Sequence, residues 1–297
     1  MGERIGYLGP GLMGKGIVKN LRKHGHEVTV VAHREGLDLS ELTQAGAAVT
    51  RSIEEAARKS TLVLLTVPSS REVEAAVLGT PGLLASMQPD SVIVDLSTSA
   101  PASTQMLAEK ARARGIHFLD APMTGTPVQA NSGELNLMIG GERAVYERVL
   151  PVLRGIAKNI FYIGPSGHGN IVKIINNFLG QLTNAGLAEM LPLAAKAGVD
   201  IQALYEVVKV SGGWSRWFEG TVPAVLRRQF PVTFHLKLAH KDMGYVADFG
   251  RLMNMPVPMT HALMSVLEIA KAQGLGDEDC KALVKLWERI GGVEVRG

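Results

Sequence analysis

Short apolar runs alternate with longer amphipathic stretches in the first half of the chain. The apolar runs have the length and composition of buried strands, and they cover residues 5–8, 28–32, 62–67, 92–96, 117–120, 135–139 and 160–163. Between them, in stretches such as 12–24 and 101–114, apolar residues recur with the helical period. Strands that alternate with helices are typical of a parallel sheet with crossover helices. The pattern therefore predicts a doubly wound α/β domain over residues 1–164.

The second half of the chain carries only the helical period. The segment Gly164-Pro-Ser-Gly-His-Gly169 is dense in turn formers and ends the strand signal, so we expect a domain boundary there. Beyond it, residues 170–197 form one long helical pattern broken only at Pro192, and further helical patterns cover 201–210, 222–229, 240–253, 260–273 and 278–290. We expect an all-α C-terminal domain over residues 165–297, linked to the first domain by the long helix.

A glycine-rich turn follows the first predicted strand and opens the first predicted helix. Its sequence is Gly9-Pro10-Gly11-Leu12-Met13-Gly14. In such a turn the first glycine permits the tight bend, the second lets the backbone approach a pyrophosphate, and the third lets the helix pack on the strand. The N–H groups at the helix start then face the phosphates. The turn therefore predicts a Rossmann-type domain that binds a dinucleotide cofactor.

The end of the second predicted strand bears on the choice between NAD and NADP. An acidic residue there, about twenty positions past the glycine turn, bonds the ribose hydroxyls of NAD. This chain has Ala32 at that point, followed by His33 and Arg34. The planar guanidinium of an arginine suits a 2′-phosphate, although both side chains are also ordinary for a solvated loop. We expect NADP as the cofactor, with NAD as the alternative.

Two later strand ends supply small polar residues. Ligands of open α/β sheets bind beyond the carboxyl ends of the strands, which is where the segments 67–69 and 97–99 fall. Hydroxyl side chains and a proline-fixed turn suit close contact with ribose and nicotinamide, and they are equally typical of plain turns. The predicted cofactor contacts at these strand ends are Val67, Pro68, Ser69 and Thr98.

Charge and composition argue against several kinds of partner. The 297 residues carry a formal net charge of +3, with 46% hydrophobic and 20% charged residues. So small a charge gives no reason to expect nucleic acid or an anionic membrane as a partner. The sequence has no signal-peptide pattern and no apolar run of membrane-spanning length. We therefore expect a cytoplasmic protein whose partner is a small molecule.

Cys280 is the single cysteine of the chain, which excludes an internal disulfide and a multi-cysteine metal site. It could serve as a lone nucleophile. The flanking sequence, Asp-Glu-Asp-Cys-Lys-Ala-Leu-Val-Lys-Leu-Trp, has an amphipathic pattern and favours a half-buried helix residue instead. We expect no metal site.

A lysine and an asparagine lie one turn apart in the long predicted helix. Lys173 and Asn177 are four residues apart and share one face. Their neighbours are largely apolar, so we expect this helix to be buried on most sides. A buried lysine is costly unless it is paired or functional, and it can readily exchange its proton with a carbonyl substrate. The alternative is a lysine whose ammonium reaches the surface, with Asn177 as a packed polar residue.

Four segments, in the same order, resemble the motifs of one family. They are the glycine turn, then Asp120-Ala-Pro-Met123-Thr124-Gly125-Thr126, then Gly169-x-x-x-Lys173-x-x-Asn-Asn177, then Lys241-Asp242 within Ala-His-Lys-Asp-Met-Gly. Together they span nearly the whole chain. The chain thereby resembles the β-hydroxyacid dehydrogenases, which include 3-hydroxyisobutyrate dehydrogenase and the short-chain semialdehyde reductases, with a C-terminal domain like that of 6-phosphogluconate dehydrogenase.

The resemblance implies catalytic roles for residues of the long helix and the helical domain. Lys173 would give a proton to the carbonyl oxygen during reduction and take it back during oxidation, while hydride moves to or from the nicotinamide. Asn177 would orient the substrate or the lysine. Lys241 would close over the cofactor, with Asp242 steadying that region. In this family the active site lies between the domains, and the long helix also builds a dimer.

The resemblance also implies a substrate pocket. Thr98 would lie between the substrate and the nicotinamide, and the acidic group of the substrate would be held by Met123, Thr124, Gly125 and Thr126. The family usually has Ser-Gly-Gly where this chain has Thr-Gly-Thr, so the last side chain should narrow or re-polarise the pocket. Trp214, Arg216 or Trp217 could line the far side of the substrate, or they could serve core or dimer packing.

Lys173 and Asn176 argue against three other functions that this fold can have. Imine reductases usually replace this lysine, non-catalytic scaffolds with the same fold typically lose it, and a 6-phosphogluconate dehydrogenase would have a histidine where this chain has Asn176. The sequence therefore predicts an NADP-dependent oxidoreductase for a small semialdehyde or hydroxy acid with an acidic group, acting as a homodimer or homotetramer. The particular substrate and the physiological direction stay open.

Overall fold

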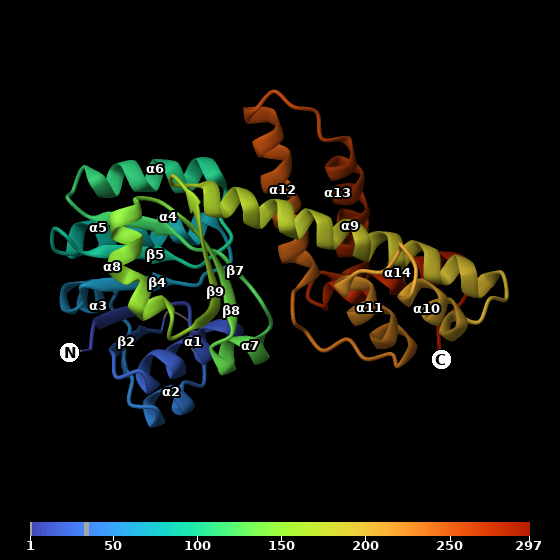
Figure 1. The fold of residues 1–297 in the computed structure, drawn as a ribbon, viewed down its shortest axis with the longest axis horizontal. Coiled ribbons are helices and arrows are strands. Elements are labelled where there is room, and N and C mark those ends of the chain that lie inside the picture. Colours follow the sequence, from blue (N-terminus) through green and yellow to red (C-terminus); the bar gives the residue numbers. More distant parts are fainter. Residues whose placement is uncertain (1, 33–35) are drawn as a thin grey trace. The chain divides into compact units, whose positions relative to one another are not determined.

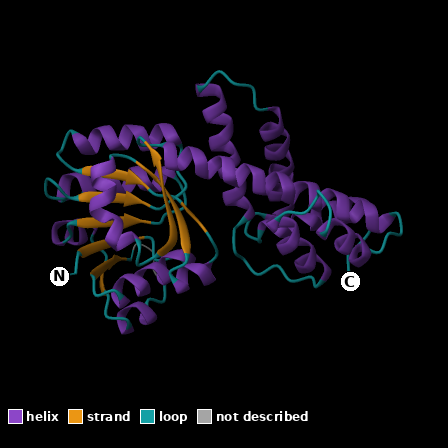
Figure 2. Ribbon diagram, viewed as in Figure 1, coloured by secondary structure: helices purple, strands orange, loops and turns teal. Residues whose placement is uncertain are grey.

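The computed structural model describes residues 2–32 and 36–297, and the predicted 2′-phosphate contacts His33 and Arg34 lie outside the described residues. The chain divides into two compact units, residues 1–173 (unit 1) and 174–297 (unit 2). In unit 1 helices flank a sheet, whereas in unit 2 the structure describes helices and loops (Figure 1, Figure 2). The predicted α/β fold followed by a helical second half is confirmed.

Unit 1 is built on one sheet. Its strands, among the described residues, are β1 (Arg4–Leu8), β2 (Glu27–Val31), β3 (Ala48–Thr50), β4 (Leu62–Leu65), β5 (Val92–Asp95), β6 (His117–Asp120), β7 (Met123–Thr124), β8 (Leu135–Gly140) and β9 (Ala157–Gly164). The order across the sheet is β3-β2-β1-β4-β5-β6-β8-β7, and β9 also pairs with β8. The strands from β3 to β6 are all parallel.

The last part of the sheet differs from the prediction. The expected parallel sheet ends at β6, because β8 runs antiparallel to β6 and to β7. An apolar run encodes burial but not strand direction, and here the chain turns back between β6 and β8 instead of crossing the sheet. The two strands that the sequence did not predict, β3 and β7, are three and two residues long, too short for a recognisable alternation.

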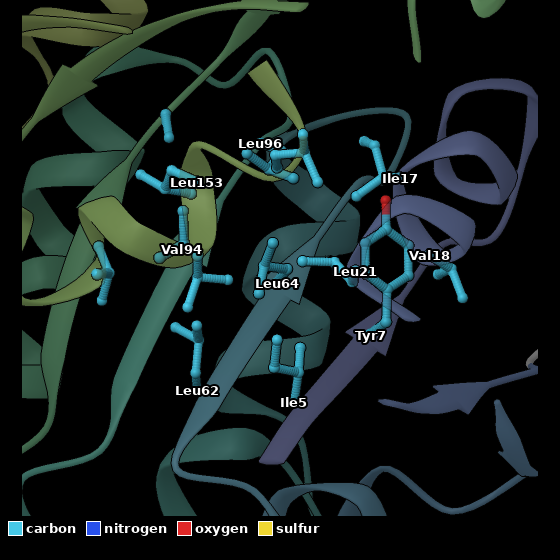
Figure 3. Close-up of a cluster of buried hydrophobic side chains, with 14 of the residues drawn as sticks. Ile5, Tyr7, Ile17, Val18, Leu21, Leu62, Leu64, Val94, Leu96 and Leu153 are labelled. Carbon is cyan, nitrogen blue, oxygen red and sulfur yellow. The ribbon is translucent and has the colours of Figure 1, made fainter. Parts of the chain in front are cut away.

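The sheet separates two hydrophobic cores. The helices around it are α1 (Leu12–Lys23), α2 (Ser40–Gln44), α3 (Ile53–Lys59), α4 (Ser70–Leu78), α5 (Leu83–Ser86), α6 (Pro101–Arg112), α7 (Pro127–Ser132) and α8 (Arg143–Leu153). On β4, Leu62 and Leu64 face one core while Val63 and Leu65 face the other, as the two-residue period of a strand requires. The core that contains Leu62 and Leu64 is called the first core below, and Figure 3 shows it around Tyr7.

Helix α9 (His168–Lys196) runs from unit 1 into unit 2. The helices that follow are α10 (Ile201–Lys209), α11 (Arg216–Leu226), α12 (Leu236–Leu252), α13 (Pro258–Ala270) and α14 (Val284–Gly291), with a π-helical turn Lys271–Leu275 and a 3₁₀ turn Cys280–Leu283. The break predicted at Pro192 is wrong, since α9 continues through it to Lys196. Proline removes one helical hydrogen bond, and the packing of buried Leu191 in the core of unit 2 favours a continuous helix.

Cys280 differs from the predicted half-buried helix residue. It is 1% exposed and begins the 3₁₀ turn that precedes α14. Burial raises the pKa of its thiol to about 12, which leaves no thiolate near neutral pH and argues against a nucleophile.

Of the helices in the described part of the chain, none is both long and apolar enough to cross a bilayer.

Candidate active site

The three glycines of the predicted cofactor turn have three different surroundings. Gly9 has a φ of +89°, and a Cβ there would lie 1.9 Å from the carbonyl oxygen of Thr66. A Cβ on Gly14 would lie 2.4 Å from the carbonyl oxygen of Gly9, whereas a Cβ on Gly11 would have no neighbour within 4 Å. The bend and the helix packing therefore need glycine, and open space lies beside Gly11, where a pyrophosphate would approach.

The start of α1 offers unpaired backbone donors to such a group. Gly11 is the N-cap residue of α1 and has no side chain to cap the helix. The first turn of a helix leaves N–H groups without helical partners, and these groups favour an anion. Leu12, the first helical residue, is exposed. The residues of this turn thus fit the diphosphate of a dinucleotide.

The ends of β4 and β5 are tied together by hydroxyl groups. Val67 donates its N–H to Ser97 Oγ at 2.9 Å. The carboxylate of Asp95 in turn accepts the N–H of Ser97 and the hydroxyl of Ser99, each at 2.9 Å. Burial raises the pKa of Asp95 to about 6, against the lowering effect of these hydrogen bonds. This carboxylate shapes the loop that carries the predicted contact Thr98.

The neighbouring strand end anchors the start of α9. Asp120, the last residue of β6, accepts the N–H of Gly167 at 2.8 Å and the N–H of Asn170 at 2.9 Å. Burial raises the pKa of its carboxyl group, and these two bonds oppose the shift. Gly140 and Gly169 make room for it, because a Cβ on either would come within 2.8 Å of the Asp120 carboxylate. The carboxylate therefore caps the helix that carries Lys173.

Asn170 joins these two arrangements. Its Oδ1 accepts the backbone N–H of Ser99 at 2.8 Å, and its Nδ2 donates to Thr104 Oγ1 at 3.2 Å. Asn170 is fully buried, with 0% exposure. Through it, the first turn of α9 is bonded to the loop next to Thr98. The sequence motif named Lys173 and Thr98 but not Asn170, because the link depends on segments about seventy residues apart.

Helix α9 is less buried around Lys173 than predicted. Lys173 is partly buried and Ile174 is fully buried, but Val172, Ile175 and Leu179 are 36%, 47% and 58% exposed. The expectation that the helix is buried on most sides is therefore wrong. Its apolar residues form two stripes, one packed inward and one facing out. Apolar composition alone does not separate a buried helix from one with an unpartnered apolar face.

The segment after β6 holds the predicted acid-binding residues in unlike settings. Met123 is 8% exposed and belongs to the first core. The hydroxyl of Thr124 accepts a hydrogen bond from Asn136 Nδ2 at 3.0 Å. Gly125 has a φ of +131°, and a Cβ on it would lie 2.9 Å from the Leu135 side chain. Thr126 caps α7 and forms a capping box with Gln129, so its hydroxyl serves the helix start.

In unit 2, Asn177 is part of a second buried polar group. Its Nδ2 donates to Asp242 Oδ2 at 2.6 Å, and Asp242 is 1% exposed. The other oxygen of Asp242 lies 2.9 Å from the ammonium of Lys241, which also lies 4.6 Å from the ring centre of Tyr245. The structure therefore brings together three residues from the third and fourth motifs. Asn177 lies on the same face of α9 as Lys173, and the bond to Asp242 fixes the orientation of its amide.

The tryptophans predicted near the substrate lie in different environments. Trp214, in the turn before α11, is 48% exposed. Trp217 is partly buried and packs against the core of unit 2, so close to α9 that a Cβ on Gly180 would lie 2.3 Å from its Nε1. Trp217 thus has a packing role, while Trp214 is available to a ligand or a partner.

A hollow of about 460 Å³ lies beside the end of β2. Its lining comprises Ala32, Gly36, Leu37, Leu39, Ser40, Thr43, Val49, Thr50 and Arg51. Ala32 donates its N–H to the carbonyl oxygen of Thr50 at 2.8 Å, which places Arg51 next to the strand end where an acidic residue would favour NAD. Among the lining residues that the structure describes, none is acidic. Sequence reasoning missed Arg51 because it follows the unpredicted strand β3.

Family models match both halves of the chain. Residues 4–164 match the NAD binding domain of 6-phosphogluconate dehydrogenase. Residues 167–287 match the model described as NAD-binding of NADP-dependent 3-hydroxyisobutyrate dehydrogenase. These matches cover the glycine turn, the Thr124 segment, and the buried hydrogen-bonded residues around Asp120 and around Asp242.

Relatives extend over the whole chain. It is 36% identical over 300 residues to 2-(hydroxymethyl)glutarate dehydrogenase of Eubacterium barkeri, covering 99% of this chain and 98% of that protein. It is 34% identical to 3-hydroxyisobutyrate dehydrogenase of Pseudomonas aeruginosa over 86% of this chain and 88% of that protein. The crystal structure of 3-hydroxyisobutyrate dehydrogenase from Salmonella typhimurium matches with a TM-score of 0.85 and 29% identity, over 95% and 99% of the two chains. The chain therefore belongs to the β-hydroxyacid dehydrogenase family, oxidoreductases that use a nicotinamide cofactor and act on the CH–OH group of hydroxy acids.

Proposed function

We propose that this protein is an NADP(H)-dependent enzyme that interconverts a small semialdehyde bearing an acidic group and the corresponding hydroxy acid. The observation that carries the proposal is the bond between Asn170 and Ser99, at 2.8 Å, together with the capping of α9 by Asp120. These bonds hold the helix of Lys173 at the carboxyl ends of β5 and β6, the edge of an open α/β sheet where ligands bind.

The glycine turn and the strand ends would hold the cofactor. The residues that we assign to it are Gly9, Pro10, Gly11, Leu12, Met13, Gly14, Val67, Pro68, Ser69, Thr98 and Lys241. A nicotinamide dinucleotide bound there supplies or accepts the hydride of the reaction. The open space at Gly11 and the uncapped start of α1 support this assignment.

Lys173 would move the proton. In the direction of reduction, hydride adds to the carbonyl carbon and the Lys173 ammonium gives its proton to the carbonyl oxygen, which yields the hydroxyl group. In the direction of oxidation the amine takes that proton back. Asn177, one helical turn further along α9 and bonded to Asp242, would orient the reacting oxygen. Thr124 and Gly125 would bind the acidic group, with Thr98 beside the reacting carbon.

The substrate class rests on the relatives. The E. barkeri protein is named for a hydroxymethyl group on an acid, and the P. aeruginosa protein for a 3-hydroxy acid. In both names the hydroxyl-bearing carbon is attached to the carbon next to the carboxyl group. With one carbon between the reacting carbon and the carboxyl group, Thr124 and Gly125 would bind the carboxylate while Lys173 exchanges the proton with the oxygen on the reacting carbon.

NADP is the proposed cofactor because of the hollow at the end of β2. The place of an NAD-selective carboxylate is taken by Ala32, and Arg51 stands beside it with a charge that suits a 2′-phosphate. His33 and Arg34 would add to this charge. The proposal predicts that NADPH outcompetes NADH.

We further propose that the protein is a homo-oligomer in which α9 packs against α9 of a second copy. The exposed apolar residues of this helix are Val172, Ile175, Leu179, Met190 and Leu193. At 3.6 residues per turn they fall within a stripe roughly 60° wide. An apolar stripe of this length on the surface of a helix is the usual mark of a helix–helix interface.

Lys173→Ala tests the proposed chemistry. Turnover of semialdehydes, followed by the absorbance of NADPH, should fall about a hundredfold or more because proton transfer is lost. The affinity for NADPH should stay nearly unchanged. Lys196→Ala, at the other end of the same helix, is the matched control and should keep full turnover. Retention of most activity by Lys173→Ala would refute the assignment, and tight binding of NADPH without turnover of any semialdehyde by the unaltered protein would favour a non-catalytic scaffold.

A further inference from the structure

Three polar side chains form a ladder across β7, β8 and β9. Thr124 on β7 lies opposite Asn136 on β8, and Asn136 lies opposite Asn159 on β9. Asn159 Nδ2 donates to Asn136 Oδ1 at 2.7 Å, and Asn136 Nδ2 donates to Thr124 Oγ1 at 3.0 Å. The hydrogen bonds run in one direction, from the outer strand toward the Thr124 hydroxyl.

The ladder occupies the face of β8 that points away from the first core. Leu135 and Leu137, on either side of Asn136, are 0% exposed and belong to that core, whereas Asn136 is half-buried. A polar side chain inside a buried strand is unfavourable unless its groups are bonded. Both ends of the Asn136 amide are bonded, one to each neighbouring strand. Its orientation is therefore held on both sides.

The direction of the bonds determines what the Thr124 hydroxyl can do. A hydroxyl has one hydrogen to donate and lone pairs that accept. Since the oxygen of Thr124 accepts from Asn136, its own hydrogen is directed to another acceptor. Within residues 2–32 and 36–297, the structure gives this hydroxyl no protein acceptor. Each donor in such a chain also polarises the next.

We propose that Asn136, supported by Asn159, is a positioning residue that makes the Thr124 hydroxyl a dedicated donor to the acidic group of the substrate. This inference rests on the proposed function, which assigns Thr124 to that group. A hydroxyl held as a donor favours an anion over a neutral group, because hydrogen bonds to charged acceptors are the stronger ones. Asn136 thereby sets the preference for acidic over uncharged aldehydes without touching the substrate.

Asn136→Asp tests the direction of the ladder. The new carboxylate has the size of the amide but can only accept, so it takes the hydrogen of Thr124. We would compare kcat/KM for methylmalonate semialdehyde and tartronate semialdehyde, in which the aldehyde carbon is attached to the carbon next to the carboxyl group, with kcat/KM for isobutyraldehyde and glyceraldehyde, their uncharged counterparts. The preference for the acidic aldehydes should fall by about tenfold or more, the loss of one hydrogen bond to a charged group. Circular dichroism and NADPH binding would verify that the variant is folded.

Two further variants separate the effect of the ladder from the effect of the added charge. Asn159→Asp places the carboxylate one strand further out, where it should turn the Asn136 amide over and reduce the preference in the same direction but less. Asn131→Asp adds the same charge to an exposed residue of α7 outside the ladder and should leave the preference unchanged. An equal effect of Asn131→Asp and Asn136→Asp would show that charge alone acts, and would overturn the inference.

A double-mutant cycle separates positioning through Thr124 from a general disturbance. Thr124→Val removes the hydroxyl, so Asn136→Asp should then add little to its loss of preference. Additive losses, or an Asn136→Asp enzyme with an unchanged preference, would overturn the inference and leave the proposed function intact. An unaltered protein that binds NADPH but reduces none of the four aldehydes would refute the proposed function, and the inference with it.

Discussion

The backbone N–H of Ser99 donates to Oδ1 of Asn170 at 2.8 Å, and both residues are buried. Ser99 follows Thr98 in the loop after β5, while Asn170 lies in the first turn of α9, one turn before Lys173. The same turn is capped by Asp120 from the end of β6. One asparagine thus fixes the distance between a loop that would contact the nicotinamide and the helix that would carry the proton donor.

Asn170→Ala should lower turnover through this positioning role. We expect kcat to fall about tenfold or more, since small displacements of a positioned acid are costly, while NADPH affinity stays within about twofold. Stability should fall by about 1–3 kcal/mol, because buried groups lose their partners. Steady-state assays give kcat and KM, and urea unfolding gives the free energy of unfolding.

The control for Asn170→Ala is Asn20→Ala. Asn20 is 6% exposed and donates to the carbonyl oxygens of Gly16, Ala130 and Asn131, away from the Thr98 loop. It should lose similar stability and keep its turnover. Equal loss of turnover in the two variants would mean that Asn170 acts through stability alone.

Asp95 should make stability depend on pH in the direction opposite to an ordinary carboxylate. Its pKa is raised to about 6 in the folded protein, against about 3.9 in an unfolded chain. Between these values the folded state binds the proton more strongly, so this group adds stability as pH falls through 6 and removes it as pH rises.

Asp95→Asn isolates that contribution. The amide can keep both bonds of the carboxylate, accepting from the Ser97 N–H and donating to Ser99 Oγ. Unfolding free energies measured at pH 5 and pH 7.5 should show that the variant gains relative to the unaltered protein at the higher pH, by up to about 1.4 kcal/mol per pH unit crossed below 6. A difference between the two proteins that does not change with pH would contradict the raised pKa.

Arg51→Ala should weaken the preference for NADPH over NADH. The expected loss of NADPH affinity is about tenfold, the contribution of one charged hydrogen-bonding partner, while NADH affinity stays unchanged because NADH has no 2′-phosphate. Fluorescence titration with both cofactors, and displacement of NADPH by 2′,5′-ADP against 5′-AMP, which differ only in the 2′-phosphate, measures this without turnover. Arg58→Ala, on α3 and outside the hollow, is the matched control. Parallel losses for NADPH and NADH would remove Arg51 from the 2′-phosphate site.

Sequence motifs predicted the parts of the site that depend on local structure. The glycine turn follows from a strand, a bend and a helix within eleven residues, and Lys173 and Asn177 share a face by helical spacing alone. Asn170, Arg51 and Asn136 could not be found in this way. Asn170 acts across the fold on Ser99, Arg51 follows a strand of three residues, and Asn136 meets Thr124 only because β8 runs antiparallel to β7.

Leu179→Arg should dissociate the proposed oligomer. Leu179 is 58% exposed in the middle of the outward apolar stripe of α9, so a charge there would be buried without a partner if two such helices pack together. Light scattering after size-exclusion chromatography should show an oligomer for the unaltered protein and a monomer for the variant. Thr183→Arg, beside the stripe on the same helix, should weaken association less. A monomeric unaltered protein, or an oligomer that tolerates Leu179→Arg, would show that this stripe does not join copies of the chain.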